Sequence, residues 1–167
     1  MQLQTLNDVL QHEVQDLYDA EQQLLEALPK MAQAASNDEL RNAFEHHLDE
    51  TRDHVRRLEE VFGQLGISAS GETCEGMRGL IKEGEKTISA QGDPAAKDAA
   101  IIAAAQRVEH YEIAAYGTAR TLADELDLEG TQDLLDQTLD EEANADKLLT
   151  KIATGGMLKT GVNEQAS

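Results

Sequence analysis

Acidic residues occur near the middle of four segments whose apolar residues follow helical periodicity. They are Glu21, Glu50, Glu109 with Glu112, and Glu142, and each lies on or beside the apolar stripe that should face a core. A carboxylate is costly to bury unless it is paired, protonated or bound to a cation. Carboxylates that converge from four helices are typical of a site in which they bridge two metal ions. The sequence therefore predicts a di-metal site.

Other potential ligands lie close to these carboxylates. Asp146 follows Glu142 by four residues, so both share one helix face. His47 and His54 lie three residues before and four residues after Glu50, and His47 could equally orient a carboxylate ligand by a hydrogen bond. An oxygen-rich set favours iron or manganese and argues against structural zinc, which prefers Cys and His.

Two long helices are predicted in the N-terminal part of the chain, and they position the first of these residues. Apolar residues at spacings of three, four and seven predict a helix from about Thr5 to Ala35, which Pro29 should bend or divide near its end. Ser36 and Glu39 resemble a capping box that opens a second helix, and glycines 63 and 66 should close it.

The remaining elements follow a change of pattern after the second helix. A shorter, glycine-weakened helix is expected from Cys74 to Ser89, and Pro94 should start a third long helix. A turn from Asp127 to Thr131 leads into a fourth. From Gly155 to Ser167 no sustained pattern remains, so we expect the end of the chain to fray. The predicted organisation is one helical bundle over residues 1–158 with a flexible C-terminal tail over 159–167.

The connection between the two hairpins predicts the topology. A long crossover is the ferritin-like arrangement, whereas an up-down-up-down bundle would use short loops throughout, so we predict an all-α, ferritin-like four-helix bundle with a fifth short connecting helix.

The spacing of the carboxylates then selects a single site. Glu21 and Glu50 are nearly equidistant from the first turn, and Glu112 and Glu142 are nearly equidistant from the second. Each arm has about 15 residues and spans roughly 22 Å. With a crossover the turns lie at opposite ends of the bundle, so all four carboxylates should meet at its middle.

Composition excludes several classes of partner. The 167 residues carry 14 Lys and Arg against 33 Asp and Glu, a formal charge of −19. Such a surface repels nucleic acid and anionic membranes, so we expect neither as a partner. The acidity fits three interpretations: solubility, attraction of divalent cations, or adaptation to a high-salt cytoplasm.

Cysteine usage and the N-terminal segment suggest a compartment. Cys74 is the only cysteine, so an intrachain disulfide is impossible and a reducing compartment is expected. The first ten residues lack the basic start and apolar run of a signal peptide, and no stretch approaches the ~20 apolar residues of a membrane span. We expect a cytoplasmic protein.

Several segments together resemble the YciE/YciF family of small ferritin-like proteins from bacteria and archaea. They are Leu17–Ala32, His47–Phe62, Cys74–Met77, Glu109–Thr118 and Leu134–Leu149, and the similarity covers nearly the whole chain. The resemblance implies a four-helix bundle with a fifth short helix, often dimeric, with a di-metal centre and a link to stress responses. A homodimer is accordingly the expected assembly.

The resemblance also assigns the candidate ligands. Better-known ferritin-like enzymes use Glu-x-x-His on two helices, whereas here Asp53 follows Glu50 and Ala145 follows Glu142 at that spacing. Other residues must then complete the shell, or the metals are held more weakly, or occupancy is partial. With His54 added from its position on the inner stripe, the predicted metal ligands are Glu21, Glu50, His54, Glu109, Glu112, Glu142 and Asp146.

Two functions compete at this point. The first is a di-iron or di-manganese protein that reacts with oxygen or peroxide, or binds iron, during stress. No flavin or ferredoxin motif occurs, so its electrons would come from a separate, unidentified donor. The second is a non-enzymatic helical stress protein that acts through dimerisation or a partner surface. Its inner carboxylates would be protonated or paired with Arg52, Arg107 or Arg120. An iron-storage cage is less favoured, because no extra helix for building a shell is evident.

Overall fold

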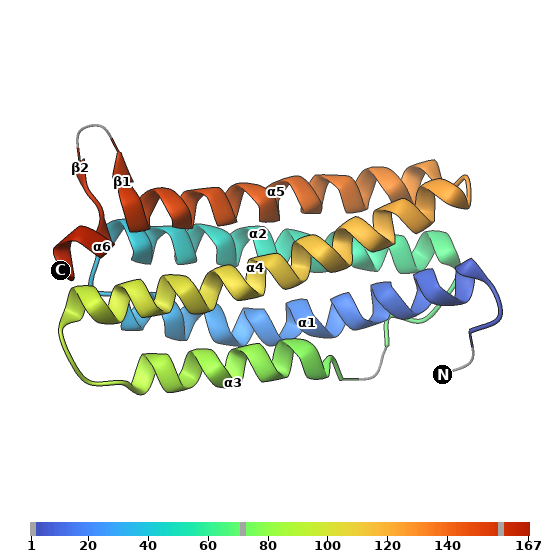
Figure 1. Ribbon diagram of the computed structural model, residues 1–167. Coiled ribbons are helices and arrows are strands. Elements are labelled where there is room, and N and C mark those ends of the chain that lie inside the picture. The colour runs from blue at the N-terminus through green and yellow to red at the C-terminus, as the bar shows by residue number, and fades with distance from the viewer. Residues whose placement is uncertain (1–2, 71–72, 157–158) are drawn as a thin grey trace.

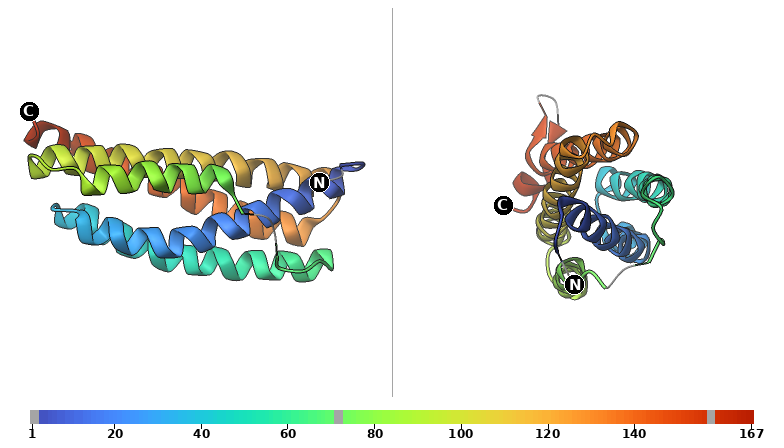
Figure 2. Two further views of the ribbon diagram at one scale, coloured as in Figure 1. Left: turned by 90° about the horizontal axis from the view of Figure 1, so that it is seen from below. Right: turned by 90° about the vertical axis from the view of Figure 1, so that its right-hand side faces the viewer.

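Four long helices lie side by side in this computed structural model, which describes residues 3–70, 73–156 and 159–167 (Figure 1). They are α1 (Leu6–Ala34), α2 (Asp38–Leu65), α4 (Pro94–Glu125) and α5 (Glu129–Thr154). A shorter helix, α3 (Glu75–Ser89), packs against α1 and α4 outside the four-helix arrangement (Figure 2). The five predicted helices are therefore confirmed.

The connection between the hairpins is the predicted crossover. Helices α1 and α2 form one antiparallel hairpin and α4 and α5 form the other, while α3 leads the chain back along the bundle (Figure 1). The turns of the two hairpins consequently lie at opposite ends of the bundle, as in ferritin-like folds. The all-α, ferritin-like fold class is confirmed.

The apolar core consists of two separate clusters of buried residues. On α1 one cluster contains Leu10, Val14 and Leu17, and the other begins at Ala20 and contains Leu24. Each of the other three long helices likewise contributes to both clusters. Apart from Asp98 and Thr131, which lie near the two turns, the buried polar residues of the four helices fall near the boundary between the clusters: Glu21, His47, Thr51, His54, Glu109, Glu112, Thr138 and Glu142. The folding pattern thus creates a polar layer at mid-bundle.

A buried carboxylate joins the two hairpins at the first turn. Asp98 on α4 accepts hydrogen bonds from the backbone N–H groups of Ser36 and Asn37 at 2.9 and 2.7 Å. Asn37 is the N-cap of α2, and its side chain accepts from Leu40 N. The predicted capping box of Ser36 and Glu39 is wrong in this respect, because Ser36 lies one residue too early and its N–H is held by Asp98.

Two further predictions differ from the structure. Pro29 lies inside α1, which continues to Ala34, so it does not divide the helix. The absence of regular structure after Gly155 is also wrong: β1 (Gly155–Gly156) pairs with β2 (Lys159–Thr160), and α6 (Val162–Gln165) follows. Val162 is buried in the core, so it anchors this end of the chain to the bundle. The flexibility predicted for residues 159–167 stays a prediction.

The start of α3 is fixed to the bundle by a polar cluster. Cys74, the N-cap of α3, is buried, and its Sγ lies 3.1 Å from Asp16 Oδ2 and 3.0 Å from the Tyr111 hydroxyl. Tyr111 also donates a 2.6 Å hydrogen bond to Asp16. The ring of Tyr111 is therefore held in place against α3, where a Cβ on Gly76 would come within 2.7 Å of it.

This contact makes Gly76 sensitive to a single added methyl group. We expect Gly76→Ala to destabilise the protein by about 1–3 kcal/mol, because Tyr111 must move or α3 must shift. Gly79→Ala is the matched control: it lies on the same helix with nothing within 4 Å of the added Cβ, and should stabilise by about 0.5–1 kcal/mol. Denaturant unfolding of both variants checks this, and equal effects would contradict the contact.

Among the helices of the described residues, none combines the length and apolarity that crossing a membrane requires.

Candidate metal centre

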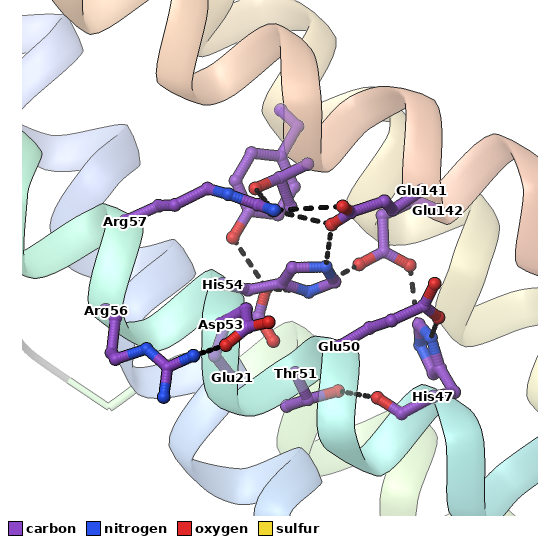
Figure 3. A network of polar contacts seen from close by, with 12 residues as sticks. Glu21, His47, Glu50, Thr51, Asp53, His54, Arg56, Arg57, Glu141 and Glu142 are labelled. Atoms are coloured by element: carbon purple, nitrogen blue, oxygen red, sulfur yellow. Dashed lines mark hydrogen bonds and ion pairs between the residues drawn. The ribbon is translucent and has the colours of Figure 1, made fainter.

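The polar layer brings side chains from all four long helices to one place. Figure 3 shows those of α1, α2 and α5 that it labels. Helix α1 contributes Glu21, α2 contributes His47 and His54, α4 contributes Glu109 and Glu112, and α5 contributes Glu142. None of these six residues is more than 5% exposed. They form two groups, each with ligand atoms within 4.8 Å of one another.

The first group contains Glu21, His54 and Glu142. His54 Nδ1 lies 3.2 Å from Glu21 Oε1 and 3.0 Å from Glu142 Oε1. Tyr116, which is fully buried, donates a 2.5 Å hydrogen bond to Glu21 Oε1. This bond holds one oxygen of Glu21 and leaves the other, Oε2, without a partner.

The second group contains His47, Glu109, Glu112 and Glu142. His47 Nε2 lies 3.5 Å from both Glu109 Oε2 and Glu142 Oε2. Glu142 therefore belongs to both groups, with Oε1 facing the first and Oε2 facing the second. A carboxylate shared in this way is placed as a bridge between two ions would be.

Most ligand atoms of the two groups lack a hydrogen-bond partner, which is uncommon for buried polar atoms. Both oxygens of Glu112 and of Glu142 are unpartnered, although Glu142 lies at ion-pair distance from His47 and His54. Two cations, one in each group, would supply partners for these atoms, and carboxylate oxygens with imidazole nitrogens suit iron or manganese. The unpartnered atoms are Glu21 Oε2, His47 Nε2, His54 Nδ1, Glu109 Oε2, and both Oε atoms of Glu112 and Glu142.

A second layer of side chains orients His54. Its Nε2 lies 2.9 Å from Glu141 Oε2, so Nδ1 points to Glu21 and Glu142 (Figure 3). Arg57 binds Glu141 through both of its terminal nitrogens and also donates to Thr138. Outer carboxylates of this kind fix the ring orientation of a histidine ligand.

In the metal-free protein, the histidines and carboxylates of the site shift one another's pKa values. Burial disfavours the charged form of His47, yet Glu109 and Glu142 outweigh it and raise its pKa to about 10. Burial also opposes a charged His54, but Glu21, Glu141 and Glu142 raise its pKa to about 12. The two histidines in turn lower the pKa of Glu142 against the effect of its burial.

The two acids on α4 behave in the opposite way. Burial, followed by nearby acidic groups, raises the pKa of Glu112 well above its usual range. Burial likewise raises the pKa of Glu109 well above its usual range, although His47 opposes the shift. A bound cation would oppose both shifts, because it favours the ionised carboxylates as ligands.

The structure separates the predicted ligands into two sets. Glu21, His54, Glu109, Glu112 and Glu142 lie in the two groups. Glu50 and Asp146 do not: their side chains are 25% and 20% exposed, and they contact other polar residues instead. The ligand roles of all seven stay predictions. His47, which the sequence left undecided between ligand and orienting residue, lies with the buried set.

Two of the arginines expected to pair with inner carboxylates pair elsewhere in the described part of the chain. Arg52 pairs with Asp49 and Arg120 with Asp136, both outside the polar layer. The outer pair that supports the site is instead Arg57 and Glu141, which sequence reasoning did not identify. Both lie one residue off a helical stripe that periodicity identifies as inner, so only the packed structure shows that they meet.

A small cavity lies between α2 and α5, next to the second group. Its volume is about 90 Å³, and its lining includes His46, His47, Glu50 and Glu109. It is far smaller than the ~300–1,000 Å³ of pockets for drug-sized ligands. It has room for water, oxygen, peroxide or a partly hydrated ion.

Comparison with known proteins matches nearly the whole chain to one family. The family model over residues 5–166 is described as a domain of unknown function (DUF892). Protein YciF of Escherichia coli is 41% identical over 165 residues, which cover 98% of this chain and 99% of that protein.

Solved structures agree with this match. The E. coli stress protein YciF has a TM-score of 0.86 at 43% identity, covering 89% of this chain and 94% of that chain. YcfI from Rhodopseudomonas palustris, for which a structural role is suggested, has a TM-score of 0.87 at 44% identity, covering 90% and 96%. A protein from Xanthomonas campestris is 19% identical with a TM-score of 0.70, covering 88% and 89%, and shares the fold.

Proposed function

Because the chain belongs to the YciE/YciF family, matched by the DUF892 model, we propose its function from its site: a di-metal carboxylate protein for iron or manganese. We propose further that it takes part in a stress response, as the description of the E. coli relative suggests, by reacting with oxygen or peroxide or by binding iron. The observation that carries the proposal is Glu142, whose two oxygens serve two ligand groups.

Each group would hold one ion with residues already in place. Glu21 and His54 would complete the first position, and His47, Glu109 and Glu112 the second, with Glu142 between them. When bound, two such ions supply Lewis acidity and a change of oxidation state. The protein buries the layer between two apolar clusters, and Tyr116 and Glu141 fix the orientation of Glu21 and His54.

The size of the cavity favours a small oxidant over an organic substrate. About 90 Å³ accommodates a diatomic molecule or peroxide next to His47 and Glu109, while larger substrates have no comparable space there. Electrons for turnover would come from a separate donor, and we propose a homodimer in the cytoplasm as the working form.

A second candidate is favoured by the directions of the pKa shifts in the site. The raised pKa values of His47 and His54 beside Glu142, and the raised pKa values of Glu109 and Glu112, all reduce the net negative charge that the layer would carry without metal. The protein would then be a non-enzymatic helical stress protein that acts through dimerisation or a partner surface. The structural role suggested for the R. palustris relative agrees with this candidate.

Metal content distinguishes the two functions. The protein is purified without tags or chelators and analysed by plasma mass spectrometry, before and after anaerobic loading with Fe²⁺ or Mn²⁺. We expect about two ions per chain in the loaded protein. Absence of metal from both samples would contradict the di-metal proposal and leave the non-enzymatic candidate.

A further inference from the structure

A continuous series of polar side chains leads from the surface of α2 to the buried ligands. The exposed fraction of the side chains falls from 69% at His46 to 25% at Glu50 and then to 6% at His47. Beyond His47, Glu109 is 4% exposed and Glu142 is fully buried. The series therefore crosses from solvent to the candidate metal centre.

Short contacts link the members of this series. His46 Nε2 lies 3.5 Å from Glu50 Oε1, and Glu50 Oε2 lies 3.2 Å from His47 Nδ1. On its other side, His47 Nε2 is 3.5 Å from Glu109 and Glu142. An ion could pass along these groups and exchange one ligand for the next without losing all of them.

The cavity between α2 and α5 lies along the same series. Its lining contains His46, His47, Glu50 and Glu109, and the α5 wall adds uncharged residues such as Ala145 and Leu148. Two buried atoms next to it, His47 Nε2 and Glu109 Oε2, have no hydrogen-bond partner. The cavity volume of about 90 Å³ leaves room for an ion beside these ligand atoms, which can replace waters of its hydration shell.

A second polar series also leads from the layer to the surface, but it is already paired. Glu141, whose side chain is 30% exposed, lies 2.9 Å from His54 and accepts hydrogen bonds from both terminal nitrogens of Arg57. Glu112, His54 and Tyr116 are fully buried. On the α2–α5 side, by contrast, Glu50 borders the cavity and contacts His46 and His47 rather than an arginine.

We propose that a divalent cation reaches the metal centre through this cavity, with Glu50 and His46 as transient ligands at its mouth. This inference rests on the proposed function, since the route serves a site that holds metal. The sequence predicted that Glu50 is a metal ligand, whereas this route assigns it a different role. Glu50 binds the ion only transiently, before His47 and Glu109 bind it, and is not a ligand of the filled site. The carboxylate lowers the cost of dehydration by replacing water on the cation.

The test is the rate of metal uptake compared with final occupancy. Co²⁺ is mixed with the metal-free protein, and the visible absorbance of bound Co²⁺ gives both the rate and the final amount. Glu50→Gln keeps the shape and a hydrogen-bond acceptor for His47 but removes the charge. We expect uptake about ten-fold slower with unchanged final stoichiometry, and a smaller slowing for His46→Gln.

Glu45→Gln is the matched control, because it removes one charge from the same helix at an exposed residue outside the cavity lining. It should load at the wild-type rate. Wild-type rate and stoichiometry in Glu50→Gln would overturn the route, and loss of final occupancy would show that Glu50 is a ligand instead. If the wild-type protein itself took up no Co²⁺, Fe²⁺ or Mn²⁺, the proposed function would fail and the route with it.

Discussion

Glu142→Gln is expected to remove most of the bound metal, lowering it from about two ions per chain to less than one. Glutamine preserves the volume, but it lacks the charge and the second anionic oxygen with which Glu142 reaches both groups. Both ions would lose a shared ligand in a buried layer where no water replaces it. Plasma mass spectrometry after anaerobic loading measures the result.

Variants that change a ligand of only one group should lose less metal than Glu142→Gln. Glu112→Gln affects the second group alone, and Glu21→Gln the first, so each should cost about one ion. Asp140→Asn removes a carboxylate from an exposed position on α5 and should retain full occupancy. Circular dichroism verifies that each variant folds. If Glu142→Gln lost no more metal than Glu112→Gln, the bridging role of Glu142 would be wrong.

The metal-free protein should become less stable as the pH rises from 7 to 9. His47 and His54 have folded-state pKa values of about 10 and about 12 against an ordinary value of 6.5. A histidine whose pKa is raised in the folded state stabilises that state fully at pH values below its ordinary pKa of 6.5. This contribution is lost as the pH rises toward the folded-state pKa. Between pH 7 and 9 the folded state binds up to two more protons than the unfolded state, one on each histidine. The free energy of unfolding should therefore fall by up to about 5 kcal/mol over these two pH units.

The other shifted acids do not reverse this trend. Glu109 and Glu112 also have raised folded pKa values, so their contributions likewise fall as pH rises above the ordinary carboxyl range. At Glu141, His54 and Arg57 outweigh the effect of burial and lower the pKa to about 2. This group therefore stabilises the folded state at pH values above the ordinary carboxyl pKa, and its contribution is lost only in acid. Its contribution is therefore constant between pH 7 and 9.

Denaturant unfolding at pH 7, 8 and 9 checks this expectation. Metal-loaded protein should show a much flatter dependence, because the ions replace the protons of the site. His54→Gln should reduce the slope of the metal-free protein, whereas His110→Gln, with a 68% exposed side chain, should keep it. An unfolding free energy that stays constant from pH 7 to 9 in the metal-free wild type would show that these histidines are not charged in the native state.

The fold could be predicted from local signals that agree with one another. Apolar periodicity, Thr5 before α1, Gly66 after α2 and Pro94 at the start of α4 all identified helix ends correctly. The long connection between the two hairpins predicted a crossover topology, which the structure has. The C-terminal hairpin and α6 escaped prediction because elements of two to four residues are too short to show a period.

The site was predicted at the level of helices and less well at the level of side chains. Residues three apart on a helix differ by about one sixth of a turn, so periodicity does not decide which of His47 and Glu50 points inward. The structure buries His47 and leaves Glu50 partly exposed. Asp146 similarly lies one turn beyond Glu142 but binds Gln106 at the helix edge. Such choices depend on the relative rotation of packed helices, which one sequence does not encode locally.

The order of the helices along the chain sets when the site can exist during biosynthesis. The ribosome delivers α1 and α2 first, with Glu21, His47 and His54, while Glu142 arrives on α5, the last long helix to emerge. A nascent chain therefore presents only part of each ligand group and lacks the residue that both share. The complete centre can therefore assemble only after α5 has been synthesised, so a translation product truncated before Glu142 would present neither complete ligand group.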